Sequence, residues 1–476
     1  MPCDWIKGDG SVVIKGVEID SRKVVQGSLF IAVRGAHTDG HRYIENAIEN
    51  GAVAVMLESI PDGFDGAEVA IIKVADTRRE SGPIAAVYFD HPSKSLQLIG
   101  VTGTNGKTSV ATMLHQLLIL HGKNAGLLST IENKIGHKVL PSSLTTPDPI
   151  SLQKLLAQMV VSDCSHVVME VSSHALDQLR TAGSEFALAI FTNVTHDHLD
   201  YHGSFDAYIQ AKKSFFDDLG LESVALMNKD DRHADVLSQN TVARCHTYAL
   251  KKPADYKARI IENSISGLQL DLDGWEVHCR LIGSFNAYNL LAVYAAARLL
   301  EIDQVVALQY LSQLEPPRGR FQTVRDNSKK VTAIIDYAHT PDALKNVLQT
   351  IQQIKQSSTE IITVVGCGGD RDKTKRPKMA QIADAYSNQI IITSDNPRSE
   401  DPPKIISDML DGLDADGRRK ALNIVDRREA IKTAYHLASA DAVILIAGKG
   451  HEVYQEIRGQ RLPFDDVEII KDCMMV

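Results

Sequence analysis

The stretch Gly100-Val-Thr-Gly-Thr-Asn-Gly-Lys-Thr108 decides the fold of this chain. It directly follows a short apolar run at residues 96–99, and after it apolar residues repeat at helical spacing from position 110 to position 118. A strand, a glycine-rich turn and a helix in this order form an anion site, because backbone N–H groups and the helix N-terminus converge on the anion. We therefore predict a loop that binds nucleotide phosphates.

Two side chains of this loop have predicted roles. Lys107 would reach the β- and γ-phosphates of the nucleotide, and the Thr108 hydroxyl would coordinate Mg²⁺. The match to the GxxxxGK[ST] pattern is imperfect, since Val101 occupies the first glycine position and Gly100 and Gly103 flank it. The alternative is a plain turn with a surface lysine, but the strand and the helix on either side favour a phosphate loop. The predicted ATP-binding residues of the loop are Gly103, Thr104, Asn105, Gly106, Lys107, Thr108 and Ser109.

Apolar runs and polar turns continue to alternate after the loop. The runs at residues 166–169 and 186–191 each lead into a polar turn, which predicts a mainly parallel sheet flanked by helices. Beyond a linker at residues 314–320, further apolar runs alternate with helical segments and predict a second, Rossmann-like unit. These runs lie at residues 331–335, 361–365, 390–393 and 442–446. We predict an α/β protein with three domains, at residues 1–94, 95–314 and 315–476.

The composition is that of a globular protein without affinity for nucleic acid. Of the 476 residues, 44% are hydrophobic and 23% are charged, and the formal net charge of −9 disfavours binding to a phosphate backbone. The first residues do not resemble a signal peptide, and no apolar run approaches the ~20 residues of a membrane helix. The six cysteines form no CxxC pair, which is typical of reduced thiols in a cytoplasmic protein.

Three segments downstream of the loop contain candidate catalytic or metal-binding residues. Glu170 ends an apolar run and would hold nucleotide-bound Mg²⁺ if its strand lies beside the loop. The segment His196-Asp-His198-Leu-Asp200 also fits the HxHxD pattern of zinc hydrolases, although such an enzyme has no need of a nucleotide loop. A third reading is that these histidines pack a turn. Lys212 lies in a helical stretch and would by itself be a solvated lysine.

Several segments, taken together, resemble the Mur ligase family. The loop is similar to the GxxGTNGKT loop of that family, and Gly283-Ser-Phe-Asn-Ala-Tyr-Asn289, Gly319-Arg320 and Asp336-Tyr-Ala-His-Thr-Pro-Asp342 resemble its nucleotide-side elements in the same order. The resemblance covers most of the chain. It implies a UDP-binding N-terminal domain, a central ATPase domain and a Rossmann-like C-terminal domain, with ATP and Mg²⁺ as cofactors. The further ATP-binding residues that it implies are Asn286, Asn289, Arg320, Asp336 and His339.

The same resemblance gives Lys212 a role. Its segment is similar to the family helix whose lysine is carbamylated, which turns a cation into a carboxylate-like metal ligand. The lysine must first lose a proton, and burial promotes this by lowering the lysine pKa. The resemblance therefore implies N6-carboxylysine at position 212. It implies catalytic roles for Lys107, Glu170, His198 and Lys212, and a metal-binding set of Thr108, Glu170, His198 and Lys212.

Three short motifs resemble the branch of the family that adds meso-2,6-diaminopimelate. They are Thr145-Thr-Pro-Asp-Pro, Glu170-Val-Ser-Ser-His-Ala-Leu and Asp395-Asn-Pro-Arg398. Arg398 can hold the distal carboxylate of diaminopimelate through two parallel hydrogen bonds, whereas L-lysine lacks this carboxylate. The implied diaminopimelate-binding residues are Arg371, Asp395, Asn396, Pro397, Arg398, Gly448 and Glu452.

The resemblance also implies a site for the nucleotide-peptide substrate, UDP-N-acetylmuramoyl-L-alanyl-D-glutamate. Leu144 departs from the asparagine expected before the two threonines, which puts one substrate contact in doubt. The implied contact residues are Ser21, His37, Thr38, Thr145, Thr146, Ser172, Gln178 and Arg180.

The implied activity is that of an ATP-dependent, amide-bond-forming ligase of peptidoglycan precursor synthesis. The γ-phosphate of ATP would pass to the substrate carboxylate, and the amine of diaminopimelate would attack the acyl phosphate. The alternatives are an L-lysine-adding Mur ligase, another ligase such as folylpolyglutamate synthase, a nucleotide-dependent switch and a zinc hydrolase. The expected partners are small-molecule substrates, and we expect a monomer that binds no nucleic acid and does not insert into a membrane.

Overall fold

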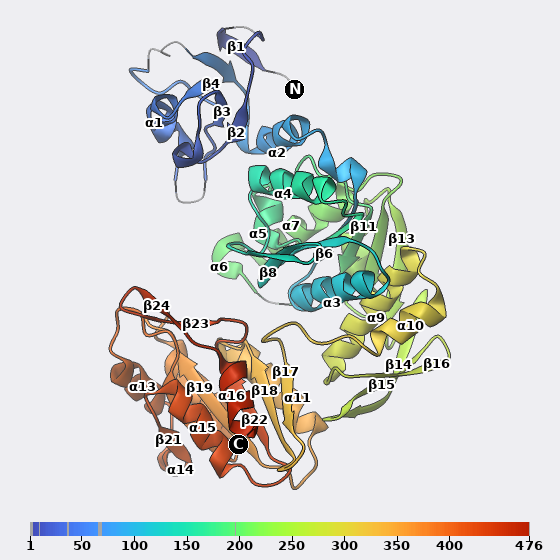
Figure 1. Ribbon diagram of the computed structural model, residues 1–476, viewed down its shortest axis with the longest axis vertical. Coiled ribbons are helices and arrows are strands. Elements are labelled where there is room, and N and C mark those ends of the chain that lie inside the picture. Colours follow the sequence, from blue (N-terminus) through green and yellow to red (C-terminus); the bar gives the residue numbers. More distant parts are fainter. Residues whose placement is uncertain (1–2, 9, 36–37, 65–68, 196, 476) are drawn as a thin grey trace. The chain divides into compact units, whose positions relative to one another are not determined.

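The computed structural model describes residues 3–8, 10–35, 38–64, 69–195 and 197–475 (Figure 1). The chain divides into two compact units. The first unit contains Met1–Lys257 and Asn289–Tyr310, and the second contains Ala258–Tyr288 and Leu311–Val476. The domain boundaries expected after residues 94 and 314 stay predictions.

A five-stranded sheet forms the N-terminal part of the first unit. Its strand order is β1 (Asp4–Lys7), β5 (Ala70–Lys73), β4 (Ala52–Leu57), β3 (Ser28–Ile31) and β2 (Gly16–Glu18), with only β1 antiparallel to its neighbour. Both faces of β3 are buried, which explains its unbroken apolar character. The helical segments here are η1 (Ser21–Lys23), η2 (Gly40–Tyr43), α1 (Ile44–Glu49), α2 (Thr77–Tyr88) and η3 (Pro92–Ser95).

The central sheet of the first unit positions the phosphate loop. Its strands lie in the order β13 (Arg244–Ala249), β12 (Val224–Asn228), β11 (Leu188–Phe191), β6 (Gln97–Thr102), β10 (His166–Glu170), β7 (Ala125–Leu128), β8 (Glu132–Ile135) and β9 (Lys138–Pro141). All pairs from β13 to β7 are parallel, as predicted. Glu170 pairs with Val101, and Phe191 pairs with Thr102, so β6, β10 and β11 end at the same edge.

Helices connect these central strands. The predicted helix after the loop is α3, which begins at Lys107 and ends at Leu120. The predicted helix around Lys212 is α7, which begins at Phe205 and ends at Asp217. The others that do so are α4 (Pro149–Val161), α5 (Ser173–Asp177), α6 (Leu199–His202) and α8 (Ala234–Leu237). The helices α9 (Ser284–Leu299) and α10 (Gln304–Leu311) come later in the chain, between β16 and β17.

An antiparallel meander begins the second unit. It consists of β14 (Tyr256–Ser264), β15 (Gly267–Leu272) and β16 (Trp275–Cys279). Tyr256 and Lys257, the first residues of β14, still belong to the first unit and pair in parallel with β13. The sequence analysis did not predict this meander.

A six-stranded sheet forms the rest of the second unit. Its order is β17 (Gln322–Asp326), β18 (Val331–Asp336), β22 (Val443–Ala447), β19 (Ile361–Cys367), β20 (Gln389–Ser394) and β21 (Ala421–Asn423), parallel except for β17. The four apolar runs predicted as strands are β18, β19, β20 and β22. A hairpin of β23 (Tyr454–Ile457) and β24 (Gln460–Pro463) follows.

Both faces of this C-terminal sheet carry an apolar core. Ile334 belongs to one core, and its neighbours Ala333 and Ile335 belong to the other, as the alternation of side chains along a strand requires. The helices of this part, drawn in orange to red in Figure 1, are α11 (Pro341–Ile354), α12 (Lys375–Tyr386), α13 (Pro402–Leu410), α14 (Ala415–Arg419), α15 (Arg427–Leu437) and α16 (Asp466–Met474). Among the described residues, no helix combines the length and apolar character that a membrane crossing requires.

Candidate active site

The phosphate loop lies between β6 and α3, where the sequence predicts it. Gly103 has φ +148°, and a Cβ atom there would lie 1.9 Å from Thr192 Oγ1. Gly106 has φ +88°, and a Cβ atom there would lie 2.6 Å from Asn289 Oδ1. Any larger residue would therefore clash at these two positions and strain the backbone at Gly106. Asn289, a predicted ATP-binding residue, lies against the loop.

The loop is anchored by the residues that follow β11. The Thr104 N–H donates to Asn193 O at 2.7 Å, and the Asn105 N–H donates to Asn193 Oδ1 at 3.0 Å. The hydroxyl of Thr192 donates to Asn105 O at 2.7 Å. Thr192 and Asn193 were not identified from sequence, because only the parallel pairing of β6 and β11 brings them to the loop.

Lys107 lies over the loop that precedes it. Its ammonium group donates to the carbonyl oxygens of Gly103 and Thr104, both at 2.9 Å. The ammonium therefore lies at the N-terminus of α3, the position from which the predicted phosphate contacts would be made.

Glu170 lies beside the loop, as predicted, and is 0% exposed. Its carboxylate accepts a hydrogen bond from the Thr108 hydroxyl at 2.9 Å and from the Thr130 N–H at 2.7 Å. Both donors are neutral groups.

Lys212 is 1% exposed and also contacts the loop. Its Nζ donates to Gly103 O at 3.0 Å and lies 4.7 Å from the centre of the Tyr208 ring. Burial, followed by the positive charge of Lys107, lowers the pKa of Lys212 well below its ordinary value. This lysine is therefore not the solvated lysine that its type alone would suggest.

His198, of the HxHxD segment, lies in a group of aromatic rings. The His198 ring lies 4.8 Å from the His174 ring, and its Nε2 lies 3.6 Å from Asp197. His196 lies outside the described residues. Among the described residues, no three His, Cys, Asp or Glu side chains are arranged to hold a metal ion.

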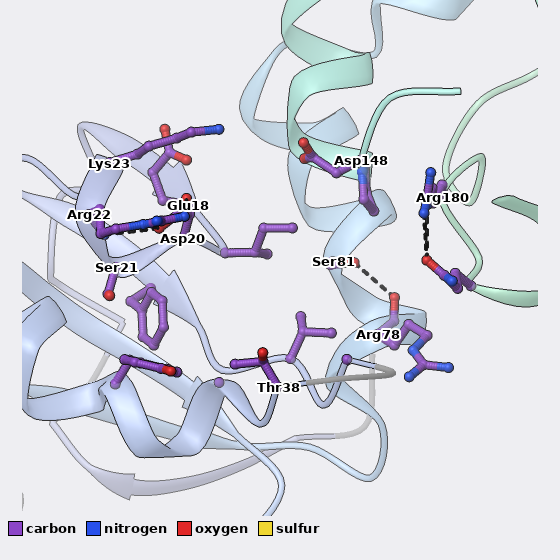
Figure 2. Close-up of a pocket in the computed structure, with 18 of the residues that line it drawn as sticks. Glu18, Asp20, Ser21, Arg22, Lys23, Thr38, Arg78, Ser81, Asp148 and Arg180 are labelled. Carbon is purple, nitrogen blue, oxygen red and sulfur yellow. Dashed lines mark hydrogen bonds and ion pairs between the residues drawn. The ribbon is translucent and has the colours of Figure 1, made fainter. Parts of the chain in front are cut away.

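A pocket of about 860 Å³ in the first unit is lined by predicted substrate residues (Figure 2). Ser21, Thr38, Gln178 and Arg180 line it, and so does Leu144. His37 lies outside the described residues. The charged lining residues that the sequence analysis did not identify are Glu18, Asp20, Arg22, Lys23, Arg78 and Asp148.

The motifs that begin at Thr145 and at Glu170 are linked by hydrogen bonds near this pocket. Arg180 donates to Thr146 O at 2.9 Å, and the Thr146 hydroxyl donates to Glu170 O at 2.8 Å. The Ser172 N–H donates to the Thr146 hydroxyl at 3.1 Å. Thr145 accepts a hydrogen bond from Thr130 at 3.0 Å. The predicted substrate residues are thereby joined to the backbone carbonyl of Glu170, beside the phosphate loop.

The second unit gathers the predicted amino-acid-binding residues around a buried lysine. Lys449 Nζ lies 3.6 Å from Asp395 Oδ1 and 3.6 Å from Glu452 Oε2. Asn396 donates to Glu452 Oε2 at 2.8 Å. Burial, and then the charge of Asp395, raises the pKa of Glu452. Gly448 lies so close to this cluster that a Cβ atom there would be 2.4 Å from Asp395 Oδ2.

Arg398 is held in a strained backbone conformation next to this cluster. Its φ is +51°, which a residue other than glycine rarely adopts. Its guanidinium donates to Gly369 O at 2.7 Å, and its Nε lies 3.5 Å from Glu456 Oε2. Strain of this kind persists where the surroundings fix it, often at functional sites. Pro397 directly precedes Arg398. Arg371 is exposed and lies two residues after Gly369 in the sequence.

The remaining predicted nucleotide-side residues lie in the second unit. Arg320 lies over the Tyr337 ring, 5.0 Å from its centre, and His339 donates to Tyr337 O at 2.9 Å. Asp336 accepts the Phe321 N–H at 2.8 Å, and burial raises its pKa. Asn286 donates to the carbonyl oxygen four residues earlier, at 2.9 Å.

Known protein families match the chain along most of its length. The profile described as Mur ligase family, catalytic domain, matches residues 13–88. The Mur ligase middle domain matches residues 101–297, and the Mur ligase, glutamate ligase domain, matches residues 319–450. UDP-N-acetylmuramoyl-L-alanyl-D-glutamate–2,6-diaminopimelate ligase from Cytophaga hutchinsonii is 51% identical, over 98% of this chain and 96% of its own. The protein of the same name from Bacteroides thetaiotaomicron is 49% identical, over 98% of this chain and 96% of its own.

The chain belongs to the Mur ligase family. A solved structure of UDP-N-acetylmuramoyl-L-alanyl-D-glutamate–2,6-diaminopimelate ligase is 36% identical, with a TM-score of 0.72 over 97% of this Mur ligase and 95% of that chain. Folylpolyglutamate synthase from Mycobacterium tuberculosis shares the fold alone. It is 17% identical, with a TM-score of 0.58 over 78% of this chain and 92% of its own. The predicted family and α/β architecture are confirmed, and family membership counts against the zinc-hydrolase alternative.

Proposed function

We propose that this Mur ligase joins meso-2,6-diaminopimelate to UDP-N-acetylmuramoyl-L-alanyl-D-glutamate, using ATP and Mg²⁺. The observation that carries the choice of amino acid is the mixed-charge cluster of Asp395, Lys449 and Glu452, with Arg398 next to it in the chain segment 395–398 and paired with Glu456. A second zwitterionic centre distinguishes diaminopimelate from L-lysine, and a site with both charges suits it. The close relatives of that name support the same choice. We also propose the three domains at residues 1–94, 95–314 and 315–476.

In the first step, the γ-phosphoryl group leaves ATP and joins a carboxylate oxygen of the nucleotide-peptide. The bond between the γ-phosphorus and the bridging oxygen breaks, and ADP leaves with its electron pair. Both reactants are anionic, so the ammonium of Lys107 and the loop N–H groups must offset their repulsion. The pocket lined by Ser21, Thr38, Gln178 and Arg180 would hold the nucleotide-peptide.

Thr108 and Glu170 form a site that fits Mg²⁺. Their oxygens lie 2.9 Å apart, the carboxylate is fully buried, and Mg²⁺ prefers such oxygen ligands. When bound there, Mg²⁺ would neutralise charge on the phosphates. Thr108 would supply a hydroxyl oxygen and Glu170 a carboxylate oxygen. His198 as a further ligand stays a prediction.

Lys212 is suited to carbamylation. The low pKa of its buried amine favours the neutral form, whose nitrogen can attack the carbon of CO₂ and then lose a proton. The product carries a negative charge on oxygen in place of the ammonium. This change would place a second oxygen anion beside the loop, next to Gly103.

In the second step, the amine of diaminopimelate attacks the carbonyl carbon of the acyl phosphate. The carbon–oxygen bond to the phosphate breaks, phosphate leaves, and the nitrogen loses a proton as the amide forms. Arg398 would hold the distal carboxylate of diaminopimelate, while Asp395 and Glu452 would receive its distal ammonium. Arg371, Asn396 and Gly448 are the other proposed contacts.

The test is ATP-dependent phosphate release with UDP-N-acetylmuramoyl-L-alanyl-D-glutamate, with either meso-diaminopimelate or L-lysine as the acceptor. We expect release and a tripeptide product with diaminopimelate and at least about 100-fold lower efficiency with L-lysine. Release with L-lysine alone would retain the ligase and refute the role of Arg398. Release with neither amino acid would refute the proposed reaction.

A further inference from the structure

Lys449 is a fully buried lysine within the mixed-charge cluster, and the two reaction steps above give it no role. It follows β22 and is 0% exposed. Its ammonium donates to Asn396 Oδ1 at 2.8 Å and to Tyr454 O at 2.8 Å, and it lies 3.6 Å from both Asp395 and Glu452. Three of these four neighbours are proposed diaminopimelate contacts.

Lys449 fixes the orientation of the Asn396 amide. An ammonium group only donates hydrogen bonds, so the amide must turn its oxygen towards Lys449. The same oxygen accepts the Glu456 N–H at 2.9 Å. The amide nitrogen consequently points to the Glu452 carboxylate, 2.8 Å away. Without the lysine, one of the two constraints on the amide would be lost.

Lys449 also sets the charge of the cluster. Asp395 and Glu452 are two carboxylates with side chains only 9% and 16% exposed. Two close, buried carboxylates repel each other, and one of them would take up a proton in the absence of a cation. With Lys449 between them, the group of three carries one net negative charge. That charge matches a single ammonium group.

We propose that Lys449 is a positioning residue for diaminopimelate, which orients Asn396 and leaves Asp395 and Glu452 with one net negative charge for the distal ammonium. This inference rests on the proposed function. Lys449 itself does not need to touch the amino acid. Its ammonium already has two hydrogen-bond acceptors and two carboxylate neighbours within 3.6 Å.

The first experiment replaces Lys449 with methionine, which keeps much of the length of the side chain and removes its charge. We expect the KM for diaminopimelate to rise at least about tenfold, because hydrogen bonds to charged groups are lost and the carboxylates repel. The KM values for ATP and the nucleotide-peptide should stay within about twofold, which places the effect on one substrate. Lys420→Met is the matched control, since Lys420 pairs with Asp384 in the same unit at 2.9 Å.

A double variant tests the charge argument. It also keeps the proposal testable if the single variant fails to fold. Lys449→Met combined with Glu452→Gln removes one positive and one negative charge, so the net charge of the cluster is unchanged. We expect the fold-increase in its KM for diaminopimelate to be smaller than the product of the fold-increases in the two single variants. Thermal unfolding of each variant shows whether it is folded.

The outcomes separate this inference from the proposed function. An unchanged KM for diaminopimelate in Lys449→Met, an equal loss for all three substrates, or fully multiplicative effects in the double variant would overturn the role of Lys449. In each case the wild-type protein would still ligate diaminopimelate. A wild-type protein that does not ligate diaminopimelate overturns the proposed function itself.

Discussion

Lys212 and Lys449 are both almost completely buried, yet their surroundings are opposite. Lys212 contacts the carbonyl oxygen of Gly103 and has Lys107 as its charged neighbour, so its pKa is low. Lys449 lies between the carboxylates of Asp395 and Glu452. Burial penalises an ammonium unless an opposite charge compensates it. The same residue type at the same burial therefore has a cationic neighbour in one unit and two carboxylate neighbours in the other.

The largest effect on kcat is expected from a change at Lys107, the charged neighbour of Lys212. Replacing Lys107 with methionine should lower kcat by about 10³-fold or more, because the transferred phosphoryl group loses its main cation. Phosphate release at saturating substrates measures this effect. Lys123→Met is the control, since Lys123 is an exposed lysine beyond the end of α3. A kcat within tenfold of the wild type would refute the role of Lys107.

The next test addresses the reactivity of Lys212 itself. Lys212→Met should lower kcat by about 10²-fold, because the proposed carbamate oxygen is lost. Protein equilibrated with ¹³C-bicarbonate should show a carbamate signal by NMR that is absent from the variant. Lys213→Met should keep the signal, because Lys213 is paired with Asp217 at 2.6 Å and is not the proposed site. A signal that persists in Lys212→Met would assign the modification elsewhere.

A third test probes the mixed-charge cluster from its cationic side. Arg398→Lys should lower kcat/KM for diaminopimelate by about 10²-fold, because a lysine cannot form two parallel hydrogen bonds to a carboxylate. The preference for diaminopimelate over L-lysine should decrease as well. Arg419→Lys, at an exposed arginine of the same unit, is the control. Unchanged selectivity in Arg398→Lys would show that another group recognises the distal carboxylate.

The smallest effect concerns stability and pH. A lysine with a lowered pKa destabilises the folded protein while it is protonated, and this penalty disappears as the pH rises through the folded pKa towards 10.5. In bicarbonate-free buffer, Lys212→Met should therefore unfold at a higher temperature than the wild type, by an amount that shrinks as the pH rises. Thermal midpoints between pH 7.5 and 9.5 measure this, and a difference independent of pH would contradict the low pKa.

Local sequence patterns were sufficient for the regular parts of the fold. The strand, loop and helix around Lys107 were predicted because glycine spacing and helical periodicity are properties of consecutive residues. The apolar strands β18, β19, β20 and β22 were predicted because strands covered on both faces are unbroken apolar runs. The meander β14–β16 was missed because strands were sought as unbroken apolar runs, whereas β15 alternates buried and partly exposed residues along its length.

The sequence by itself determined the phosphate loop, the alternation of strands and helices, and the motifs that place the chain among the Mur ligases. Tertiary structure alone decided which side chains meet. Parallel pairing brings Asn193 and Glu170 to the loop, and chain folding puts Lys449 between Asp395 and Glu452, which are 57 residues apart in sequence. Contacts of this kind leave no local pattern, because they depend on strand order and burial rather than on the spacing of neighbouring residues.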